Sequence, residues 1–519
     1  MAYFLLKNER SLLSFVEQYS IFFDTFIIFF ICTCGTDSKT ILSSMKIAFV
    51  TPASNLHKTP LYRAGHLIYE PANSIPGPLI LGKILTRSGH TVAVYEELYR
   101  NLPLKKILSA DVIGISTMTS TAPRAYALAD YFRLKGKRVI LGGFHASALP
   151  EEAKRHCDQV IVGEAEGVIT EVIDGTITEP IVRGQPITDL DSIPFPDYSL
   201  LRSPVTIANF MTTRGCPNTC SFCTTSRMFH PYREMSCERV IEAIRWYRAQ
   251  GFSRVNIQDD NFTANKPRAK RILKMLIDNG LAFRETFFFG RIDVAEDEEL
   301  VALLKKAGFR IILVGMESTN QKSLDTVNKM QQVKQIYNNA TRLTECGMKL
   351  SASIILGLDF DTKQTIEQTV DFCRSIGAYS LQVPILTPFP GTPLYKKFKE
   401  EGRILTDSWH YYDMMHAVFQ PDTMSPLELQ NLFVTSAARF YSFGSIYGVF
   451  RRWGIVEALK RLGMALSIKC CIFLKLFTER KYYTLIVNKS ISEKCKSPEM
   501  QSKKLFTLTP SIEKYSAER

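Results

Sequence analysis

The chain has 519 residues, of which 45% are hydrophobic and 22% are charged. This composition is ordinary for a globular protein and excludes a disordered chain, a collagen and a protein with many membrane spans. The length predicts two or three domains. The formal net charge is +13, but residues 445–519 supply +9 of it. The basic character therefore belongs to the C-terminal region and does not by itself indicate a nucleic-acid-binding protein, so we expect no nucleic-acid partner.

The twelve cysteines are scattered, apart from one tight group formed by Cys216, Cys220 and Cys223. Small secreted proteins that depend on disulfides are denser in cysteine, and dispersed thiols suit a reducing compartment. We therefore expect a cytoplasmic protein in which the tight group binds a metal.

The first 44 residues differ from the rest of the chain. Their apolar run Phe26–Ile31 is short, and Glu17 and Asp24 interrupt any longer span, so a transmembrane helix is not predicted. At Met45 the sequence changes abruptly into a buried-strand pattern. We expect folding to begin there, with residues 1–44 a doubtful, dispensable N-terminal extension. An N-terminal membrane anchor or a signal peptide is the alternative.

Residues 45–185 alternate short apolar runs with helical patterns. The predicted strands are Ile47–Val50, Thr91–Tyr95, Val112–Ile115, Val139–Leu141 and Val160–Val162. The predicted helices are Leu79–Arg87, Pro123–Lys135 and Pro150–His156. This α/β alternation with nearly continuous apolar strands predicts a doubly wound parallel sheet, a Rossmann-like domain whose ligand lies at the carboxyl ends of the strands.

Residues 186–204 contain prolines and acidic residues that break this pattern, and are the predicted linker. A second alternation occupies residues 205–400. Its predicted strands are Thr206–Met211, Arg254–Ile257, Thr286–Phe289, Ile311–Val314, Leu350–Leu356 and Leu381–Ile385. Its predicted helices are Glu238–Gln250, Pro267–Asn279, Asp297–Ala307, Lys334–Cys346 and Thr365–Ile376. Six such units predict a partial (β/α)6 barrel rather than a closed eightfold one.

The three clustered cysteines have the spacing C-x3-C-x2-C and follow the first strand of this second alternation. Soft thiolate ligands favour iron–sulfur sites, and three thiolates hold three corners of a four-iron cluster while leaving one iron open. Zinc is the alternative, with His230 or Cys237 available as a fourth ligand.

The loop Arg214–Cys223 resembles the radical S-adenosylmethionine (SAM) superfamily, whose motif is C-x3-C-x-aromatic-C, with Phe222 at the aromatic position. The resemblance implies that Cys216, Cys220 and Cys223 ligate a [4Fe–4S] cluster and that SAM binds its open iron. It also implies SAM contacts for Phe222, Arg291 and Glu317, which follow or end predicted strands. For Arg291 and Glu317 a plain salt bridge at the barrel rim is the alternative.

The first domain resembles the cobalamin-binding domain fused to many radical SAM enzymes, through glycines and hydroxyls after its third and fourth strands. By this resemblance Ser116, Thr117, Gly142 and Gly143 would line the buried tail of cobalamin. The chain has no Asp-x-His, so the motif that supplies a histidine to cobalt in many such domains is absent. A domain that keeps the fold without binding cobalamin is the alternative.

Residues 401–490 form the predicted helical C-terminal region, and residues 491–519 a disordered tail. In residues 445–477 apolar side chains recur at helical spacing among Lys and Arg residues. This pattern suits an interfacial helix that gives peripheral contact with the inner membrane face. A helix that packs on the barrel and exposes a basic face is the alternative.

Taken with the family resemblance, these features predict a cobalamin-dependent radical SAM enzyme related to hopanoid and bacteriochlorophyll methylases and to the anaerobic magnesium-protoporphyrin ester cyclase. The expected reaction is methylation of an unactivated carbon in a lipid-like, pigment or other small-molecule substrate. An external donor of the flavodoxin or ferredoxin type would supply electrons. A cyclisation or oxidation without methyl transfer is the alternative reaction, and a non-catalytic cluster protein is the alternative class.

Overall fold

The computed structural model describes residues 44–54, 74–203, 205–463 and 465–466. Its contacts divide the chain after Ser44, and everything described below belongs to the second unit. The predicted N-terminal extension, the end of the predicted helical region and the predicted disordered tail lie outside the described residues.

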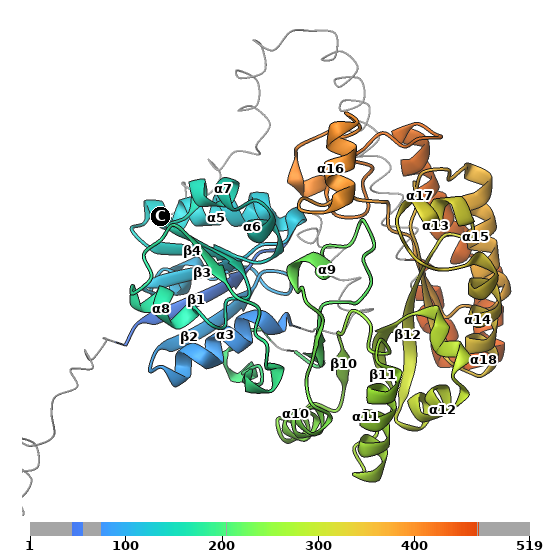
Figure 1. Ribbon diagram of the computed structural model, residues 1–519, viewed down its shortest axis with the longest axis horizontal. Coiled ribbons are helices and arrows are strands. Elements are labelled where there is room, and N and C mark those ends of the chain that lie inside the picture. Colours follow the sequence, from blue (N-terminus) through green and yellow to red (C-terminus); the bar gives the residue numbers. More distant parts are fainter. Residues whose placement is uncertain (1–43, 55–73, 204, 464, 467–519) are drawn as a thin grey trace, which may run out of the picture. The chain divides into compact units, whose positions relative to one another are not determined.

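The first sheet contains six parallel strands in the order β2-β1-β3-β4-β5-β6. The strands are β1 (Lys46–Thr51), β2 (Thr91–Glu96), β3 (Val112–Ser116), β4 (Arg138–Gly142), β5 (Gln159–Gly163) and β6 (Ile181–Gly184). The helices are α3 (Pro76–Arg87), α4 (Leu104–Ile107), α5 (Ala122–Leu134), α6 (Phe144–Ala148), α7 (Pro150–Ala153) and α8 (Ile169–Asp174). Helices α5, α6 and α7 bury their apolar side chains on one face, and α3 and α8 on the other (Figure 1).

This arrangement confirms the predicted doubly wound sheet. The sequence pattern missed β6 because that edge strand has only two apolar residues, too few for a recognisable period. The order of the strands reverses between β1 and β3, since β2 and β3 lie on opposite sides of β1. Ligands of such sheets bind at this switch point, at the carboxyl ends of the strands.

The second sheet also has six parallel strands, in the order β14-β13-β12-β11-β10-β7. They are β7 (Ala208–Phe210), β10 (Val255–Ile257), β11 (Thr286–Gly290), β12 (Phe309–Glu317), β13 (Lys349–Ile354) and β14 (Ser380–Gln382). The helices are α9 (Thr225–Met228), α10 (Cys237–Ala249), α11 (Lys266–Asp278), α12 (Glu298–Lys306), α13 (Gln321–Thr326), α14 (Val333–Glu345) and α15 (Lys363–Ser375). In Figure 1 helices α11, α12, α14 and α15 lie on the outer side of this sheet. The first and last strands are its edges, so the predicted partial barrel is confirmed.

The predicted linker, residues 186–204, packs on both domains rather than spanning a gap. Leu190 and Ile193 are buried in the core of the barrel. Leu200 and Leu201 are instead buried in the core of the first domain, where Leu201 also bridges to Val94 of β2. The chain thus leaves the first domain, packs against the barrel, returns to the first domain and only then enters β7.

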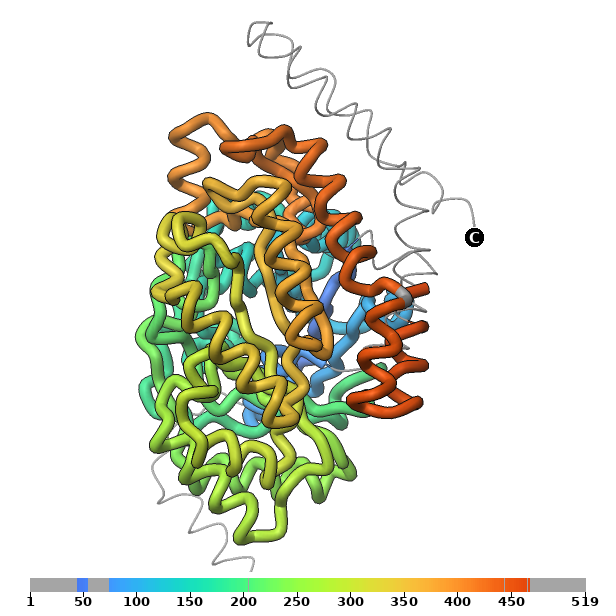
Figure 2. Tube along the Cα trace, turned by 90° about the vertical axis from the view of Figure 1, so that its right-hand side faces the viewer, coloured from blue at the N-terminus to red at the C-terminus, as the bar shows by residue number. Residues whose placement is uncertain are grey.

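Beyond β14 the helices are α16 (Pro393–Glu400), α17 (Pro426–Phe440), α18 (Phe443–Trp453) and a further helical stretch over 455–463. The region is helical as predicted from α17 onward, whereas the only helical element within residues 401–425 is a 3-10 turn at Trp409–Tyr411. Figure 2 shows α18 and this stretch, coloured red, on the outside of the barrel. Within the described ranges, no helix combines the length and the apolar composition needed to cross a membrane.

Candidate active site

The cysteine loop begins on a small antiparallel pair formed by β8 (Thr213–Arg214) and β9 (Arg233–Glu234). Gly215 follows at a φ of +80°, and a Cβ on it would lie 2.3 Å from the carbonyl oxygen of Phe229. Only glycine fits this turn into the loop. Cys220 is buried, Cys216 and Cys223 are half-buried, and all three are free thiols.

A second loop, residues 327–331 after α13, packs on the cysteine loop. The Ser221 amide donates to the carbonyl of Val327 at 3.0 Å. The side-chain amide of Asn328 donates to the Thr219 hydroxyl at 2.8 Å. Asn328 and Met330 both have positive φ values, 52° and 53°, which non-glycine residues rarely adopt. Such strain persists only where surrounding contacts impose it, and it is concentrated at functional sites.

This second loop also joins the two residues predicted to contact SAM. Lys329 forms a buried ion pair with Glu317, the last residue of β12. Arg291 donates from Nη2 to the carbonyls of Lys329 and Met330, each at 3.0 Å. Glu317 therefore forms the rim salt bridge that was the alternative for it, with Lys329 as its partner, whereas Arg291 bonds to backbone carbonyls.

The charges of this loop cluster act on the Cys220 thiol. Burial raises the pKa of Cys220, Lys329 and Arg291 act in the opposite direction, and Glu317 and Cys223 reinforce the rise. The structure thus brings the predicted residues Arg291 and Glu317 next to the cysteine loop. Sequence reasoning missed Lys329, because it follows α13, far along the chain from the cysteines, and only the fold brings its loop to them.

The donor set suits an iron–sulfur cluster better than a single metal ion. Across residues 44–54, 74–203, 205–463 and 465–466, no three His, Cys, Asp or Glu side chains converge where one ion could bind. In a cluster each cysteine binds a different iron, so its sulfur ligands need not meet at one point. Cys237, the proposed fourth ligand for zinc, starts α10 and lies among Arg268, Arg271 and Glu238. Its surroundings do not suit the zinc alternative.

Two adjacent carboxylates follow β10, beside the cysteine loop. Asp259 is fully buried and accepts hydrogen bonds from the Thr212 hydroxyl and the Thr213 amide, which fixes the end of β7 to the end of β10. Burial raises the pKa of Asp259. Burial also raises the pKa of Asp260 to about 6, and its Oδ2 has no hydrogen-bond partner. Asp259 therefore builds the site, while Asp260 offers an unused oxygen near it.

The residues predicted to line the cobalamin tail lie together at the ends of β3 and β4. The Thr117 hydroxyl donates to the Gly142 carbonyl at 2.8 Å and accepts from the Ala146 amide at 3.0 Å. Gly143 has a φ of +96°, and a Cβ on it would lie 2.7 Å from the Thr117 carbonyl oxygen and 3.2 Å from the Ser116 hydroxyl. Thr117 and Gly143 thus shape the loop itself, and the Ser116 hydroxyl is the side-chain group left for a ligand.

Buried polar atoms without partners mark the same edge of the sheet. They are Thr51 Oγ1 at the end of β1, Glu96 Oε2 at the end of β2 and His145 Nδ1 after β4. Unsatisfied buried polar atoms are costly and rare, so several at one edge indicate that a polar ligand completes it. Cobalamin carries amide side chains and a phosphate that could do so, and the residues present therefore fit it.

The carboxyl edges of the two sheets meet. Phe144, directly after Gly143, contacts Phe229 beyond the cysteine loop, with ring centroids 5.8 Å apart. Glu152 on α7 accepts a hydrogen bond at 2.9 Å from the indole of Trp409, in the C-terminal region. Both predicted cofactor sites therefore open toward the same region of the molecule.

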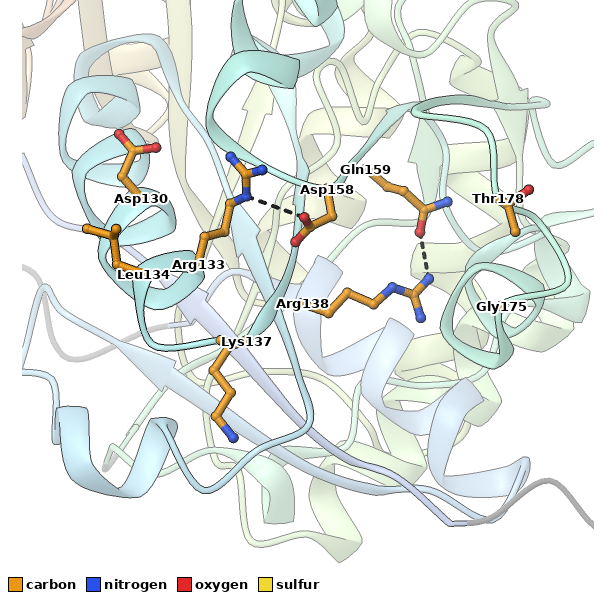
Figure 3. A pocket seen from close by; sticks show the side chains of 10 residues that line it. Asp130, Arg133, Leu134, Lys137, Arg138, Asp158, Gln159, Gly175 and Thr178 are labelled. Carbon is orange, nitrogen blue, oxygen red and sulfur yellow. Dashed lines mark hydrogen bonds and ion pairs between the residues drawn. The ribbon is translucent and has the colours of Figure 1, made fainter.

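A surface groove of about 1000 Å³ lies elsewhere (Figure 3). Arg138, at the start of β4, and Gln159, at the start of β5, line it, so it borders the amino ends of the strands. Its charges pair internally, as Arg133 does with Asp158 at 3.3 Å. We assign it no part in the site.

The fold and site define a class of enzyme: a doubly wound domain and a partial barrel that carry two cofactor sites at facing carboxyl edges. Residues 80–173 match the B12 binding domain, and residues 210–373 match the radical SAM superfamily. The chain is 30% identical over 365 residues to the bacteriochlorophyllide d C-8(2)-methyltransferase of Chlorobaculum tepidum, covering 65% of this chain and 79% of that one. The chain belongs to the radical SAM enzymes that carry a B12-binding domain.

Two further proteins extend the comparison. The anaerobic magnesium-protoporphyrin IX monomethyl ester cyclase of Rubrivivax gelatinosus is 24% identical over 421 residues, with 73% of each chain covered. The fold resembles that of TsrM from Kitasatospora setae, a radical SAM methyltransferase solved with cobalamin and a [4Fe-4S] cluster bound. The TM-score is 0.58 at 14% identity, and the match covers 82% of this chain and 98% of TsrM. The family's cofactors, a [4Fe–4S] cluster, SAM and cobalamin, are accordingly those of this chain.

Proposed function

We propose that the protein is a methyltransferase that transfers a methyl group to an unactivated carbon of a flat, apolar small molecule, with a tetrapyrrole pigment as the first candidate and a lipid as the second. The observation that supports it most is the 30% identity to a bacteriochlorophyllide methyltransferase over most of both domains. The facing carboxyl edges of the two sheets support it independently, because methyl transfer between cofactors requires their sites to adjoin.

The roles of the individual residues are part of this proposal. Cys216, Cys220 and Cys223 would hold the cluster, with Phe222 packed beside it against the barrel core. Glu317 would contact SAM, and its pairing with Lys329 supports this by fixing the position of the carboxylate. Arg291 would act by holding the backbone of residues 329 and 330 in place. At the first sheet, the Ser116 hydroxyl and the Gly142 backbone would border cobalamin, and Thr117 and Gly143 would shape the loop around it.

When bound, the reduced cluster supplies the electron that cleaves SAM, and cobalamin supplies a transferable methyl group. We propose that the electron comes from an external carrier of the flavodoxin or ferredoxin type, because the described residues hold no other clustered thiols. A cytoplasmic location is part of the same proposal, since the described cysteines are all free.

The test is anaerobic reconstitution of the full chain with iron, sulfide and hydroxocobalamin, followed by reduction and addition of SAM. We expect 5′-deoxyadenosine from the wild type and none from the Cys216→Ala, Cys220→Ala, Cys223→Ala triple variant. Cys346→Ala is the matched control, because Cys346 ends α14 and lies outside the site. A reconstituted wild type that never forms 5′-deoxyadenosine would overturn the assignment.

The kind of reaction is tested with a pigment extract and a lipid extract as probes. SAM with a deuterated methyl group should give S-adenosylhomocysteine and a product that carries the label. The similarity to the ester cyclase favours a second candidate, a radical cyclisation without methyl transfer. An unlabelled, oxidised product without S-adenosylhomocysteine would select that candidate.

We also propose peripheral contact with an anionic membrane through the helices after β14. On residues 455–463 and 465–466 the buried side chains are Ala458, Arg461 and Ala465, while most of the exposed side chains are apolar. The exposed apolar residues, 46–66% accessible, are Tyr447, Phe450, Ile455, Val456, Leu459 and Leu466. Exposed Arg451 and Lys460 flank them. Apolar and basic groups on one exposed surface suit the interface of an anionic bilayer.

Vesicle flotation tests this contact with the full chain. The wild type should float with phosphatidylcholine vesicles that contain phosphatidylglycerol, and the fraction should fall with salt. Val456→Glu/Leu459→Glu should stay in the soluble fraction, whereas Leu134→Glu, at an exposed apolar position on α5, should float like the wild type. Equal flotation of all three proteins, or of none, would contradict the proposal.

A further inference from the structure

Four charged side chains are buried where the cysteine loop meets the first domain. Arg214 of β8 bonds through Nη1 to Glu164 Oε2 at 2.7 Å and through Nη2 to Glu166. Arg233 of β9 bonds to both oxygens of Glu164. The four side chains are between 2% and 12% exposed. We call them the Glu164 cluster.

The Glu164 cluster is electrically neutral, and both oxygens of its central carboxylate, that of Glu164, accept hydrogen bonds. Glu164 accepts from both arginines and from the Ile187 amide at 2.9 Å, and Arg233 also donates to the Ile187 carbonyl at 2.6 Å. Such burial of ion pairs is weak evidence for added stability, because desolvation offsets the attraction. A buried carboxylate that is hydrogen-bonded to two arginines does, however, fix the relative positions of the segments that carry these side chains.

Its place in the fold makes that geometry relevant to both cofactor sites. Glu164 directly follows β5, the neighbour of β4, whose end carries Gly142 and Gly143. Arg214 stands one residue before Gly215, where the turn into the cysteine loop begins, and its guanidinium lies 5.7 Å from the centroid of the Phe229 ring. A shift at Glu164 therefore moves the start of the cysteine loop relative to the edge of the first sheet.

The backbone on both sides is equally constrained. A Cβ at Gly184, on β6, would lie 1.7 Å from the Glu164 carbonyl oxygen, so β6 packs closely against the Glu164 backbone. Gly215 is in contact with the Phe229 carbonyl. The ion pairs of Glu164 with Arg214 and Arg233 thus connect the closely packed backbone after β5 to the closely packed backbone at the start of the cysteine loop.

We propose that Glu164, Arg214 and Arg233 are positioning residues that set the separation between the [4Fe–4S] cluster site and the cobalamin site. This inference rests on the proposed function, because it takes both cofactors to be bound at the edges described. Neither cofactor site fixes this separation by itself. The separation matters because a misplacement of about 1 Å between reacting groups costs about 100-fold in rate.

The test measures that separation magnetically in the reconstituted full chain. Reduction of the cluster makes it paramagnetic, which raises the microwave power needed to half-saturate the electron paramagnetic resonance signal of nearby cob(II)alamin. The wild type should show this rise. Glu164→Gln, which removes the charge but keeps the shape, should show a smaller rise, and Glu164→Asp should recover part of the difference.

Glu457→Gln is the matched control, since Glu457 also belongs to a buried ion pair, 3.1 Å from Lys349 and away from both cofactor edges. It should lose thermal stability as Glu164→Gln does and keep the wild-type magnetic rise. If Glu164→Gln fails to fold or to hold cobalamin, Glu166→Gln, which removes only the outer arm, decides by the same measurement.

The outcomes separate the two proposals. A wild type that binds no cobalt or no iron defeats the proposed function. If the wild type binds both and the Glu164 and Glu166 variants show the same rise in half-saturation power, the positioning role is wrong. The Glu164 cluster is then a plain structural contact.

Discussion

Single side chains at the carboxyl edges combine burial with incomplete hydrogen bonding. Glu96, at the end of β2, accepts from the Ile75 amide at 3.1 Å through Oε1, while its Oε2 has no partner. Lys329 and Glu317 form an ion pair between side chains that are 9% and 6% exposed. Both features cost folding free energy unless a proton or an opposite charge compensates them. Two predictions follow from that cost.

Glu96 makes the stability of the first domain depend on pH. Burial raises its pKa from 4.5 to about 7. Between these values the folded chain keeps a proton that the unfolded chain has released, so stability falls as the pH rises through this window. The loss amounts to about 3 kcal/mol. As the pH rises from about 4.5 to about 8, the free energy of unfolding of the wild type should fall by this amount relative to that of Glu96→Gln. Urea unfolding at several pH values measures this difference.

The control for this measurement is Glu179→Gln, at an exposed position in the same domain. Its stability should follow the wild type across the whole pH range. Parallel pH profiles for Glu96→Gln and the wild type would show that Glu96 is ionised in the folded chain.

Removing Lys329 should leave Glu317 as an uncompensated buried charge. Lys329→Met is expected to lower the free energy of unfolding by about 3 kcal/mol, and Glu317→Gln added to it should restore much of the loss. Lys274→Met breaks a solvent-exposed pair with Glu299 and should change the stability little, because water and salt screen exposed ion pairs. Denaturant unfolding of the metal-free chain measures the wild type, Lys329→Met, Glu317→Gln, the double variant and Lys274→Met. Strictly additive losses for Lys329→Met and Glu317→Gln would contradict a direct Lys329–Glu317 pairing.

At the scale of elements, both domains build their sites from loops that directly follow parallel strands. The hydrophobic pattern predicted these strands well because buried parallel strands are continuous apolar runs. It missed β8, β9 and α13, which are two to six residues long and carry no period. Those short elements hold the cysteine loop and the loop with Lys329, so the part of the site that they position could not be predicted from periodicity.

The loop after β4 provides a prediction at this scale. Gly143→Ala puts a side chain at a φ of +96° and 2.7 Å from the Thr117 carbonyl oxygen. The strain and the clash together should cost about 2–4 kcal/mol. Gly175→Ala, at a φ of +79° with open space around it, should cost only about 1 kcal/mol.

Urea unfolding and the cobalt content after reconstitution check this pair of variants. Gly143→Ala should bind less cobalt per chain, and Gly175→Ala should bind as much as the wild type. Equal cobalt content in both would remove the loop after β4 from the cobalamin site.

For the whole molecule, the family motif and the strand–helix alternation sufficed to predict the two domains and their order. Arg291 and Glu317 were predicted as SAM contacts from the family resemblance, and their places at the carboxyl ends of strands agreed with it. Lys329, the Glu164 cluster and the path of residues 186–204 were not predictable in this way. Each depends on contacts between segments distant in sequence, such as Arg233 with Glu164, and a lone charged residue carries no sign of its partner.

The path of residues 186–204 leads to a last prediction, that the two halves of this segment stabilise different domains. Leu200 is buried against Gly82 of α3 in the first domain, while Leu190 is buried in the barrel. Truncation of a buried leucine costs about 2–5 kcal/mol. Hydrogen exchange measured by mass spectrometry should therefore rise in β1, β2 and α3 for Leu200→Ala, and in α10 and β10 for Leu190→Ala, because local openings report the stability of each unit. Leu134→Ala, at a position 86% exposed, should change neither. If both variants loosened the same elements, the segment would be a single unit belonging to one domain, and its return from the barrel to the first sheet would not contribute to stability.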